Sequence, residues 1–150
     1  MHPGNSMDNL TYKTATGDED LKGIIAVRKE VFTGEMGIPE ELVFDGLDER
    51  MLQIVVKDGE TVIATTRVRF LADNQAKLER MAVLKDFRNR GIGRQIISFL
   101  DGELRARQVK QVILHAQHEA IAFYRSCGFK ETGDPFWEVG IKHIKMHRQL

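Results

Sequence analysis

The sequence is poor in the features that mark secreted, membrane-spanning or strongly charged proteins. Cys127 is its only cysteine, which excludes an internal disulfide and a cysteine-rich zinc site. Its apolar stretches are short and interrupted by charged residues, so no transmembrane helix is expected. The first ten residues, MHPGNSMDNL, have no apolar segment of the kind that a secretory signal needs. These absences predict a cytoplasmic protein.

Neither sign of charge is in excess. Lys and Arg total 22, and Asp and Glu also total 22, which gives a formal net charge of +0. Aromatic residues make up only 7% of the chain. A protein with no general positive field and few aromatic residues is a poor candidate for binding nucleic acid or an anionic membrane. We therefore expect that any anionic ligand is held by a local arrangement of donors.

A chain of 150 residues fits one domain with a single hydrophobic core. We expect residues 1–9 to be a flexible or vector-derived N-terminus and residues 10–150 to form the domain. No repeat, low-complexity tract or linker interrupts the order of strand-like and helix-like segments. This order predicts an α/β protein of the α+β type, with a mixed central sheet flanked by helices.

Periodicity and turn residues predict the elements of this domain. The β-branched runs at 51–57 and 61–71 flank Asp58-Gly59-Glu60, which is a strong hairpin signal. A capping box over Thr16–Glu19 precedes a helix that is expected to end near Gly34 and Gly37. Residues 35–50 are polar and are expected to be irregular. The other expected elements are strands at 10–15, 76–84, 109–116 and 140–150, a long helix with Ile92, Ile96, Leu100 and Leu104 on one face, and a short helix over 118–129 closed by Gly128.

The most informative stretch is RNRGIG, which starts at Arg88 and stands between an expected strand and the long helix. The first backbone N–H groups of a helix have no partner within the helix, and they attract phosphate. Gly91 and Gly93 let a ligand approach the backbone, and Arg90 and Arg94 add positive charge beside that of Arg88. The stretch therefore predicts a phosphate cradle. A solvated loop that simply ends at two glycines is the alternative.

Two other phosphate-binding motifs do not fit these residues. A Walker-type loop ends in Gly-Lys-Ser/Thr, whereas Gly93 is followed by Arg94-Gln95. A dinucleotide fingerprint needs a third glycine at the position of Ile96. The stretch is therefore neither a P-loop nor a Rossmann turn.

RNRGIG matches the Arg/Gln-x-x-Gly-x-Gly/Ala signature of the GNAT superfamily of acyl-CoA-dependent N-acetyltransferases. The preceding LERMAVLKDF resembles the central strand and approach loop of that superfamily, and HEAIAFYRSCGF resembles its A-x-x-[FL]-Y-x-x-x-G-F helix. The stretches VRKEVFTGEMGIPEELVFDGLDE and GIKHIKM extend the resemblance to the ElaA-like and YjcF-like acetyltransferases. The resemblance covers about residues 10–150.

The resemblance implies a fold in which the strand at 78–84 splays from its neighbour at 112–116. It implies that the pantetheine arm of acetyl-CoA pairs with the strand backbone exposed there, while the diphosphate lies on the glycine stretch. His118 stands where the superfamily more often has an asparagine that bonds pantetheine. The cofactor-binding residues implied are Met81, Ala82, Val83, Arg88, Asn89, Arg90, Gly91, Ile92, Gly93, Arg94, His118 and Phe123.

Acetyl transfer to an amine needs a base for the amine proton and an acid for the leaving thiolate. The resemblance implies that Tyr124 is the acid, and a phenol with a pKa of about 10 suits a thiolate of similar basicity. From spacing alone, Tyr124 also fits a core aromatic residue. Glu79 is a candidate base because many relatives use a carboxylate on this strand, but it also fits an ion pair with Arg80 or Arg67. His115 is a rival base that also fits a core histidine.

The acceptor side is expected on the first helix, the loop after it and the last strand. Carboxylates there would attract a cationic amine, although a solvated loop is the alternative. Lys142 replaces the proline of the subgroup's Gly-Ile-Pro-His motif. The acceptor-binding candidates are Arg28, Phe32, Glu35, Asp48 and His143.

No metal site is expected, because the histidines lack cysteine pairs or a matching carboxylate.

These residues predict an acetyl-CoA-dependent N-acetyltransferase that acetylates a primary amine of a small molecule or of a protein lysine. Direct attack in a ternary complex is favoured over a covalent route through Cys127, because no base lies at a fixed spacing from that thiol. The alternative of a different class is a non-catalytic acyl-CoA-binding sensor or interaction module, which would not need Tyr124. The sequence is also compatible with a homodimer.

Overall fold

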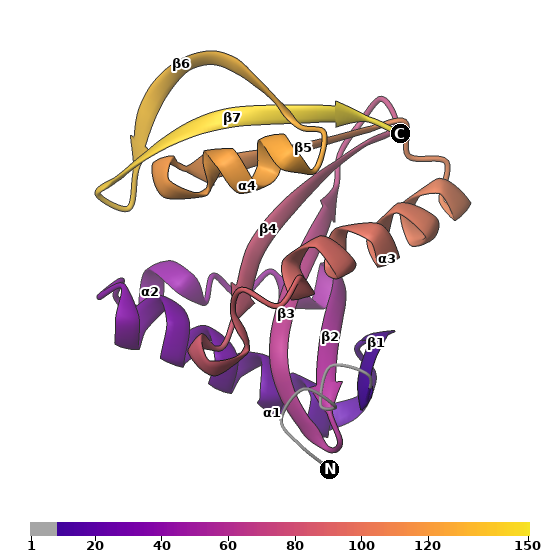
Figure 1. Cartoon of the computed structure of the whole chain (residues 1–150), viewed down its shortest axis with the longest axis vertical. Coiled ribbons are helices and arrows are strands. Elements are labelled where there is room, and N and C mark those ends of the chain that lie inside the picture. The colour runs from indigo at the N-terminus through magenta and orange to yellow at the C-terminus, as the bar shows by residue number, and fades with distance from the viewer. Residues whose placement is uncertain (1–8) are drawn as a thin grey trace. The chain divides into compact units, whose positions relative to one another are not determined.

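The structure, a computed structural model, describes residues 9–150. Residues 1–8, on which the expectation of an N-terminal tail mainly rests, lie outside the described residues. Seven strands form a sheet in the order β1-β2-β3-β4-β5-β7-β6 (Figure 1). The β4–β5 pair is parallel, whereas β1–β2, β5–β7 and β6–β7 are antiparallel, so the predicted mixed α+β sheet is confirmed. The strands are β1 (Leu10–Thr14), β2 (Leu52–Asp58), β3 (Thr61–Phe70), β4 (Gln75–Val83), β5 (Gln111–Gln117), β6 (Lys130–Glu138) and β7 (Ile141–Gln149).

The helices agree with the sequence prediction except in the segment 35–50, where two short helices replace the expected irregular loop. None of the helices in the described part of the chain is long and apolar enough to cross a membrane. The α-helices are α1 (Gly17–Arg28), α2 (Glu40–Val43), α3 (Ile92–Ala106) and α4 (Ile121–Ser126). The other helical segments are the π-helical η2 (Lys29–Glu35) and the 3-10 turns η3 (Asp48–Arg50), η4 (Lys85–Phe87) and η5 (His118–Ala120).

The described residues group into two compact units, of which the first contains the chain up to Arg67 together with Arg80–Ile96. In this unit α1 packs closely on β3. A Cβ atom at Gly23 of α1 would clash with the side chain of Val62, so only glycine permits this approach of helix to sheet. Strand β2 carries three consecutive residues that are 0% exposed, Ile54, Val55 and Val56, and it is therefore buried on both faces.

The start of α1 differs from the predicted capping box. The side chain of Thr16 makes no capping bond to the helix, and the predicted reciprocal residue Glu19 is exposed. Instead, the N–H of Thr16 donates to Asp20 Oδ2 at 2.8 Å, and the Nζ atoms of Lys13 and Lys57 lie 2.8 and 3.0 Å from the same carboxylate. The hydrogen bond from Lys13 is the largest of the effects that lower the pKa of Asp20, which keeps this buried carboxylate charged.

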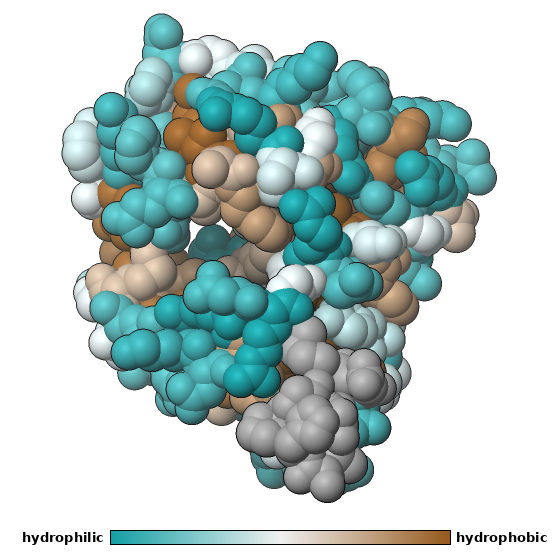
Figure 2. Space-filling model, viewed as in Figure 1, coloured by the Kyte–Doolittle hydropathy of each residue, from teal (hydrophilic) through white to brown (hydrophobic). Residues whose placement is uncertain are grey.

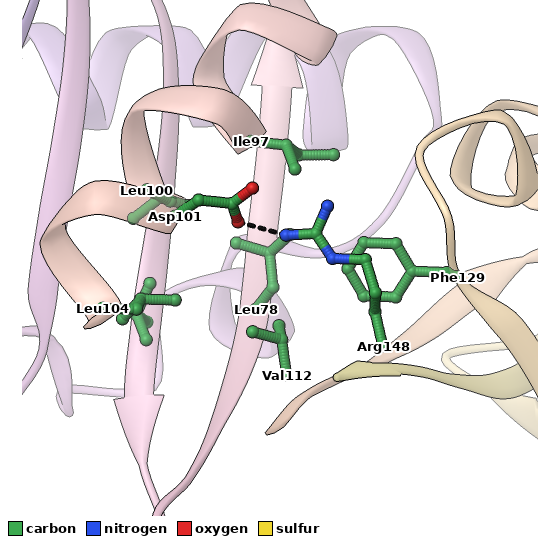
Figure 3. Close-up of a pocket in the computed structure, with 9 residues that line it drawn as sticks. Leu78, Ile97, Leu100, Asp101, Leu104, Val112, Phe129 and Arg148 are labelled. Atoms are coloured by element: carbon green, nitrogen blue, oxygen red, sulfur yellow. Dashed lines mark hydrogen bonds and ion pairs between the residues drawn. The ribbon is translucent and has the colours of Figure 1, made fainter. Parts of the chain in front are cut away.

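The second unit contains Val68–Glu79 and Ile97–Leu150. In it, α3 packs over β4 and β5 with an apolar crevice between them (Figure 3). Arg148 of β7 reaches into this crevice, pairs with Asp101 and lies over the ring of Phe129, with 5.1 Å from its Cζ to the ring centroid. The residues predicted to share the buried face of α3 are at most 2% exposed, which confirms the stripe Ile92, Ile96, Leu100 and Leu104.

Strand β6 was not predicted from the sequence. Its residues are mostly exposed, so its sequence shows no alternation of apolar and polar positions. The pairing of β6 with β7 is irregular between Thr132 and Phe136, where Gly133 has φ +78° and Pro135 cannot donate to the ladder. Trp137 on this strand is 72% exposed. Most of the molecular surface in view in Figure 2 is hydrophilic.

Candidate active site

The predicted phosphate cradle lies in the first unit, where η4 leads into α3. Asn89 and Gly91 adopt left-handed conformations with φ of 62° and 81°. These two residues turn the chain immediately before α3 begins at Ile92. A Cβ atom built on Gly91 would meet nothing within 4 Å. The N–H of Gln95 donates to the Gly91 carbonyl at 3.0 Å, so the amides before it in the first turn lie outside the helix's own hydrogen-bond ladder. The local geometry therefore suits an anion.

Two arginines of this stretch, Arg88 and Arg90, contact neighbouring protein groups. The Arg88 Nε donates to the Val83 carbonyl at 2.9 Å, and its Nη2 lies 2.8 Å from Glu35 Oε1. Arg90 lies over the ring of Phe87, with 5.5 Å from its Cζ to the centroid. The structure thus brings together Arg88, predicted for the cofactor, and Glu35, predicted for the acceptor. A pantetheine bond to the Val83 carbonyl would share that carbonyl with Arg88.

Strands β4 and β5 pair over only part of their length. Their parallel register runs from Gln75 opposite Gln111 to Leu78 opposite Leu114, whereas the strands continue to Val83 and Gln117. Two residues after Leu78, Arg80 has φ 55°, a left-handed conformation within a strand that interrupts regular pairing. The parallel register with β5 therefore ends just before this point of β4.

A buried charge network joins two predicted acceptor residues, Arg28 and Asp48, in the first unit. Arg28 is 0% exposed, and its Nη1 lies 2.7 Å from Asp48 Oδ2 while its Nη2 donates to Gln53 at 3.0 Å. Arg67, 1% exposed, contacts Asp48 Oδ1 at 3.0 Å and Asp45 Oδ2 at 2.7 Å. The hydrogen bond from Arg67 lowers the pKa of Asp45. Both oxygens of Asp48 already accept from arginine, which limits what it offers to an amine.

Tyr124, the predicted acid, lies on α4 in the second unit. Its ring makes edge contacts with Phe123 and Phe129, with centroids 5.0 and 5.8 Å away. The N–H of Phe129 donates to the Tyr124 carbonyl at 3.0 Å, and Gly128 with φ +92° closes the helix as predicted. Tyr124 is half-buried, and desolvation of its phenol raises its pKa. The phenol therefore stays protonated but releases its proton less readily than a free phenol, which weakens the match to a thiolate. The contacts fit both an acid and a core aromatic residue.

The two candidate bases differ in their surroundings. The side chain of Glu79 is 6% exposed, and its carboxylate lies 3.4 Å from Arg69 Nε and 3.3 Å from Lys77 Nζ. Glu79 thus forms ion pairs, as the alternative expected, but these partners are Arg69 and Lys77, whereas the sequence suggested Arg80 or Arg67. Its role as base stays a prediction. The side chain of His115 is 26% exposed, and its Nδ1 lies 3.2 Å from Glu138 Oε2. Glu138 was missed in the sequence because the strand that carries it was missed.

In the described part of the chain, no three His, Cys, Asp or Glu side chains form a group that suits a metal ion.

The predicted site residues divide between the two units. The first unit holds Met81, Ala82, Val83, Arg88, Asn89, Arg90, Gly91, Ile92, Gly93, Arg94, Arg28, Phe32, Glu35 and Asp48. The second unit holds Tyr124, Phe123, Glu79, His115, His118 and His143.

The chain is similar to known proteins over most of its length. The acetyltransferase (GNAT) domain family matches residues 15–150. The uncharacterized N-acetyltransferase YjcF of Bacillus subtilis is 36% identical over 133 residues, which cover 88% of this chain and 94% of YjcF. A solved structure from Lactobacillus plantarum, assigned as an N-acetyltransferase, is 26% identical with a TM-score of 0.89, covering 94% of this chain and 98% of that one. Escherichia coli ElaA is 22% identical with a TM-score of 0.80, covering 93% and 99%.

These matches confirm the resemblance to ElaA-like and YjcF-like acetyltransferases and the predicted fold. YjcF and a second relative from Bacillus subtilis are named as acetyltransferases, which favours an enzyme over a sensor that only binds acyl-CoA. Solved structures of this fold include proteins with CoA or acetyl-CoA bound. The chain therefore belongs to the GNAT family of acetyl-CoA-dependent N-acetyltransferases.

Proposed function

We propose that this protein transfers an acetyl group from acetyl-CoA to a primary amine by direct attack while both substrates are bound. The observation that carries the proposal is the left-handed turn at Asn89 and Gly91, which leads into the first turn of α3 with open space beside Gly91. Main-chain amides at that turn suit the diphosphate of acetyl-CoA, and Arg90 and Arg94 add positive charge nearby. Met81 is the third residue from the end of β4, which ends at Val83. We propose that its backbone bonds the pantetheine arm.

The second unit supplies the proposed acid and base. The amine nitrogen attacks the thioester carbonyl carbon, forming a C–N bond while the C–S bond breaks. Tyr124 gives its phenolic proton to the departing thiolate. Because its pKa is raised, this transfer is proposed to occur only as the C–S bond breaks and negative charge develops on sulfur. The proton lost by the amine passes to a base, for which Glu79 and His115 are the candidates. Exchange with solvent then returns a proton from the base to the tyrosinate.

The acceptor is proposed to be a primary amine, on a small molecule or on a protein lysine. Glu35 is proposed to contribute negative charge near the acceptor, since its second carboxylate oxygen is not the one that contacts Arg88. Asp48 is a weaker candidate for direct contact with the amine because Arg28 and Arg67 occupy its two oxygens. The arginine network is therefore better suited to fixing the loop that follows α2 than to binding the amine.

Two glycines of the same helix provide a test with an internal control. Gly93→Leu places a side chain in the first turn of α3, where it would block the diphosphate. Gly102→Leu adds the same side chain later in α3, where an added Cβ atom meets nothing within 4 Å. We expect Gly93→Leu to raise the acetyl-CoA Kd by at least about tenfold, which corresponds to ~1.4 kcal/mol. Calorimetric titration should show little change for Gly102→Leu.

An unchanged acetyl-CoA affinity in a folded Gly93→Leu protein would contradict the cradle. Transfer itself is measured as thiol release over a panel of primary amines that includes polyamines, amino acids and lysine peptides. Release with at least one amine, together with mass spectrometry of the acetylated product, is the expected result. Binding of acetyl-CoA without release for every amine class would contradict the proposed acceptor chemistry.

A further inference from the structure

A carboxylate on β6 lies between two histidines on neighbouring strands. The Oε2 atom of Glu138 is 3.2 Å from Nδ1 of His115, and its Oε1 atom is 4.0 Å from Nε2 of His143. Phe136 completes the group. Its ring stands edge-on to His115 with centroids 4.9 Å apart, and it stacks on His143 at 5.9 Å with 25° between the planes. Four side chains from β5, β6 and β7 thus form one cluster within the second unit.

The register of the sheet explains how these residues meet. Strand β7 pairs with both β5 and β6, and His143 is the register partner of Gln117 on one side and of Phe136 on the other. His115 and Glu138 lie two residues along the chain from those partners. Because alternate residues of a strand point to the same face of the sheet, all members of the cluster project from one face.

The hydrogen bonds of the cluster fix the protonation of both rings when they are neutral. A carboxylate only accepts, so Nδ1 of His115 must donate to Glu138, which leaves the lone pair on Nε2. Nδ1 of His143 lies 2.7 Å from the Ile141 carbonyl, which also only accepts, so that ring has the same tautomer. The side chain of His143 is 5% exposed, whereas that of His115 is 26% exposed. His115 is therefore the more exposed of the two rings.

His115 also occupies a special position on β5. The parallel pairing with β4 ends at Leu114, so His115 is the first residue of β5 beyond the paired stretch. Other charged groups lie around it. Lys145 is its register partner on β7, and Glu79 follows Leu78 at the end of the paired stretch of β4. Of the carboxylates near this end of β5, Glu138 contacts the His115 ring nitrogen directly.

We propose that Glu138 is a positioning residue that holds His115 in the Nδ1–H tautomer and thereby presents Nε2 as the base for the acceptor amine. The inference rests on the proposed acetyl transfer. The amine proton moves to Nε2, directly or through one water molecule, and the resulting imidazolium carries its charge next to the Glu138 carboxylate. The arrangement uses the same division of labour as a carboxylate–histidine pair in hydrolases, where the carboxylate selects the tautomer and stabilises the imidazolium. In this proposal the base is His115 and not Glu79.

Nitrogen-15 NMR of the histidine side chains tests the tautomer without relying on catalysis. Spectra are recorded at increasing pH until the nitrogen shifts no longer change, so that neutral rings are compared. We expect His115 to carry its proton on Nδ1 in the wild-type protein and in Asp134→Ala, a control that removes an exposed carboxylate from the same strand. In Glu138→Ala the proton should move to Nε2 for a substantial fraction of the molecules. An Nε2–H ring in the wild-type protein would overturn the inference.

Kinetics then tests the catalytic consequence. We expect Glu138→Ala to lower kcat by about tenfold or more, as is typical when general-base catalysis is impaired, with a small change in the acetyl-CoA KM. Glu138→Asp should recover part of this loss, and Asp134→Ala should change kcat by less than about twofold. A normal kcat and pH–rate profile in Glu138→Ala would overturn the inference while leaving acetyl transfer intact. Absence of transfer by the wild-type protein would instead refute the proposed function, and the inference about the base would fall with it.

Discussion

Removing one carboxylate from the buried arginine network should destabilise the protein far more than removing a surface carboxylate nearby. In Asp48→Ala, the Nη1 of Arg28 loses its acceptor, and Arg28 is 0% exposed. Arg67 keeps its contact with Asp45 at 2.7 Å. The variant therefore leaves one buried guanidinium without a compensating carboxylate, rather than dismantling the whole network.

The expected magnitude follows from this geometry. Breaking a buried ion pair by removing one partner costs about 3–5 kcal/mol. The Asp48 side chain is 22% exposed, so water can reach part of the vacated space, and we expect the lower end of that range, ~3 kcal/mol. For a chain of this size, each kcal/mol lowers Tm by roughly 2–4 °C, so Tm should fall by roughly 6–12 °C.

Two further variants make the assay discriminating. Glu40→Ala removes a carboxylate from a surface pair, since Glu40 and its partner Lys29 have side chains 55% and 53% exposed and 3.6 Å apart. Its effect should stay within about 1 kcal/mol. Arg28→Met removes the buried charge and keeps much of the volume, and Asp48 retains Arg67. We therefore expect it to destabilise less than Asp48→Ala, because no buried charge is left unpaired.

The measurement is urea-induced unfolding of the wild-type protein and the three variants, followed by circular dichroism, with thermal unfolding as a second estimate. An Asp48→Ala protein that is no less stable than Glu40→Ala would refute the reasoning. So would an Arg28→Met protein that is less stable than Asp48→Ala, because the loss of the guanidinium would then matter more than its lack of a partner.

The remaining predictions concern catalysis and acid stability. Tyr124→Phe should lower kcat by about 10²-fold and leave the acetyl-CoA Kd nearly unchanged, and an unaltered kcat would remove Tyr124 from the role of acid. Glu79→Gln should keep the acidic limb of the pH–rate profile, because Arg69 and Lys77 hold that carboxylate in ion pairs, and loss of the limb would make Glu79 the base. The lowered pKa of Asp20, due first to Lys13, means that its contribution to stability is complete above about pH 5 and is lost as the pH falls below that value. The stability difference between wild type and Asp20→Asn should therefore shrink between about pH 5 and pH 2 in urea titrations, and a constant difference would contradict this.

Features that depend on neighbouring residues were predictable. The apolar spacing of α3 and the Asp58-Gly59 turn each act within a few residues, so the helix stripe and the hairpin of β2 and β3 agree with the sequence. The glycine stretch was predictable for the same reason. Its two left-handed residues and the helix start that follows them lie within five positions of the chain.

The features that failed prediction depend on residues distant in the chain. The N–H of Thr16 bonds Asp20 rather than the expected Glu19 side chain, and Lys57, 37 residues away, helps to hold that carboxylate. Strand β6 exists because β7 pairs with it, although its exposed residues give no alternating pattern.

By itself, the sequence determined the order of the elements other than β6, the glycine turn before α3 and the family, because each is encoded in short contiguous stretches. Only the tertiary structure decided which charges meet. Arg28 and Asp48 are 20 residues apart in the sequence, and His115 and Glu138 are 23 residues apart. Sheet register and loop packing bring each pair within hydrogen-bond distance. Spacing along the chain carries no record of such pairings, since they arise only when strands and loops distant in sequence are packed together.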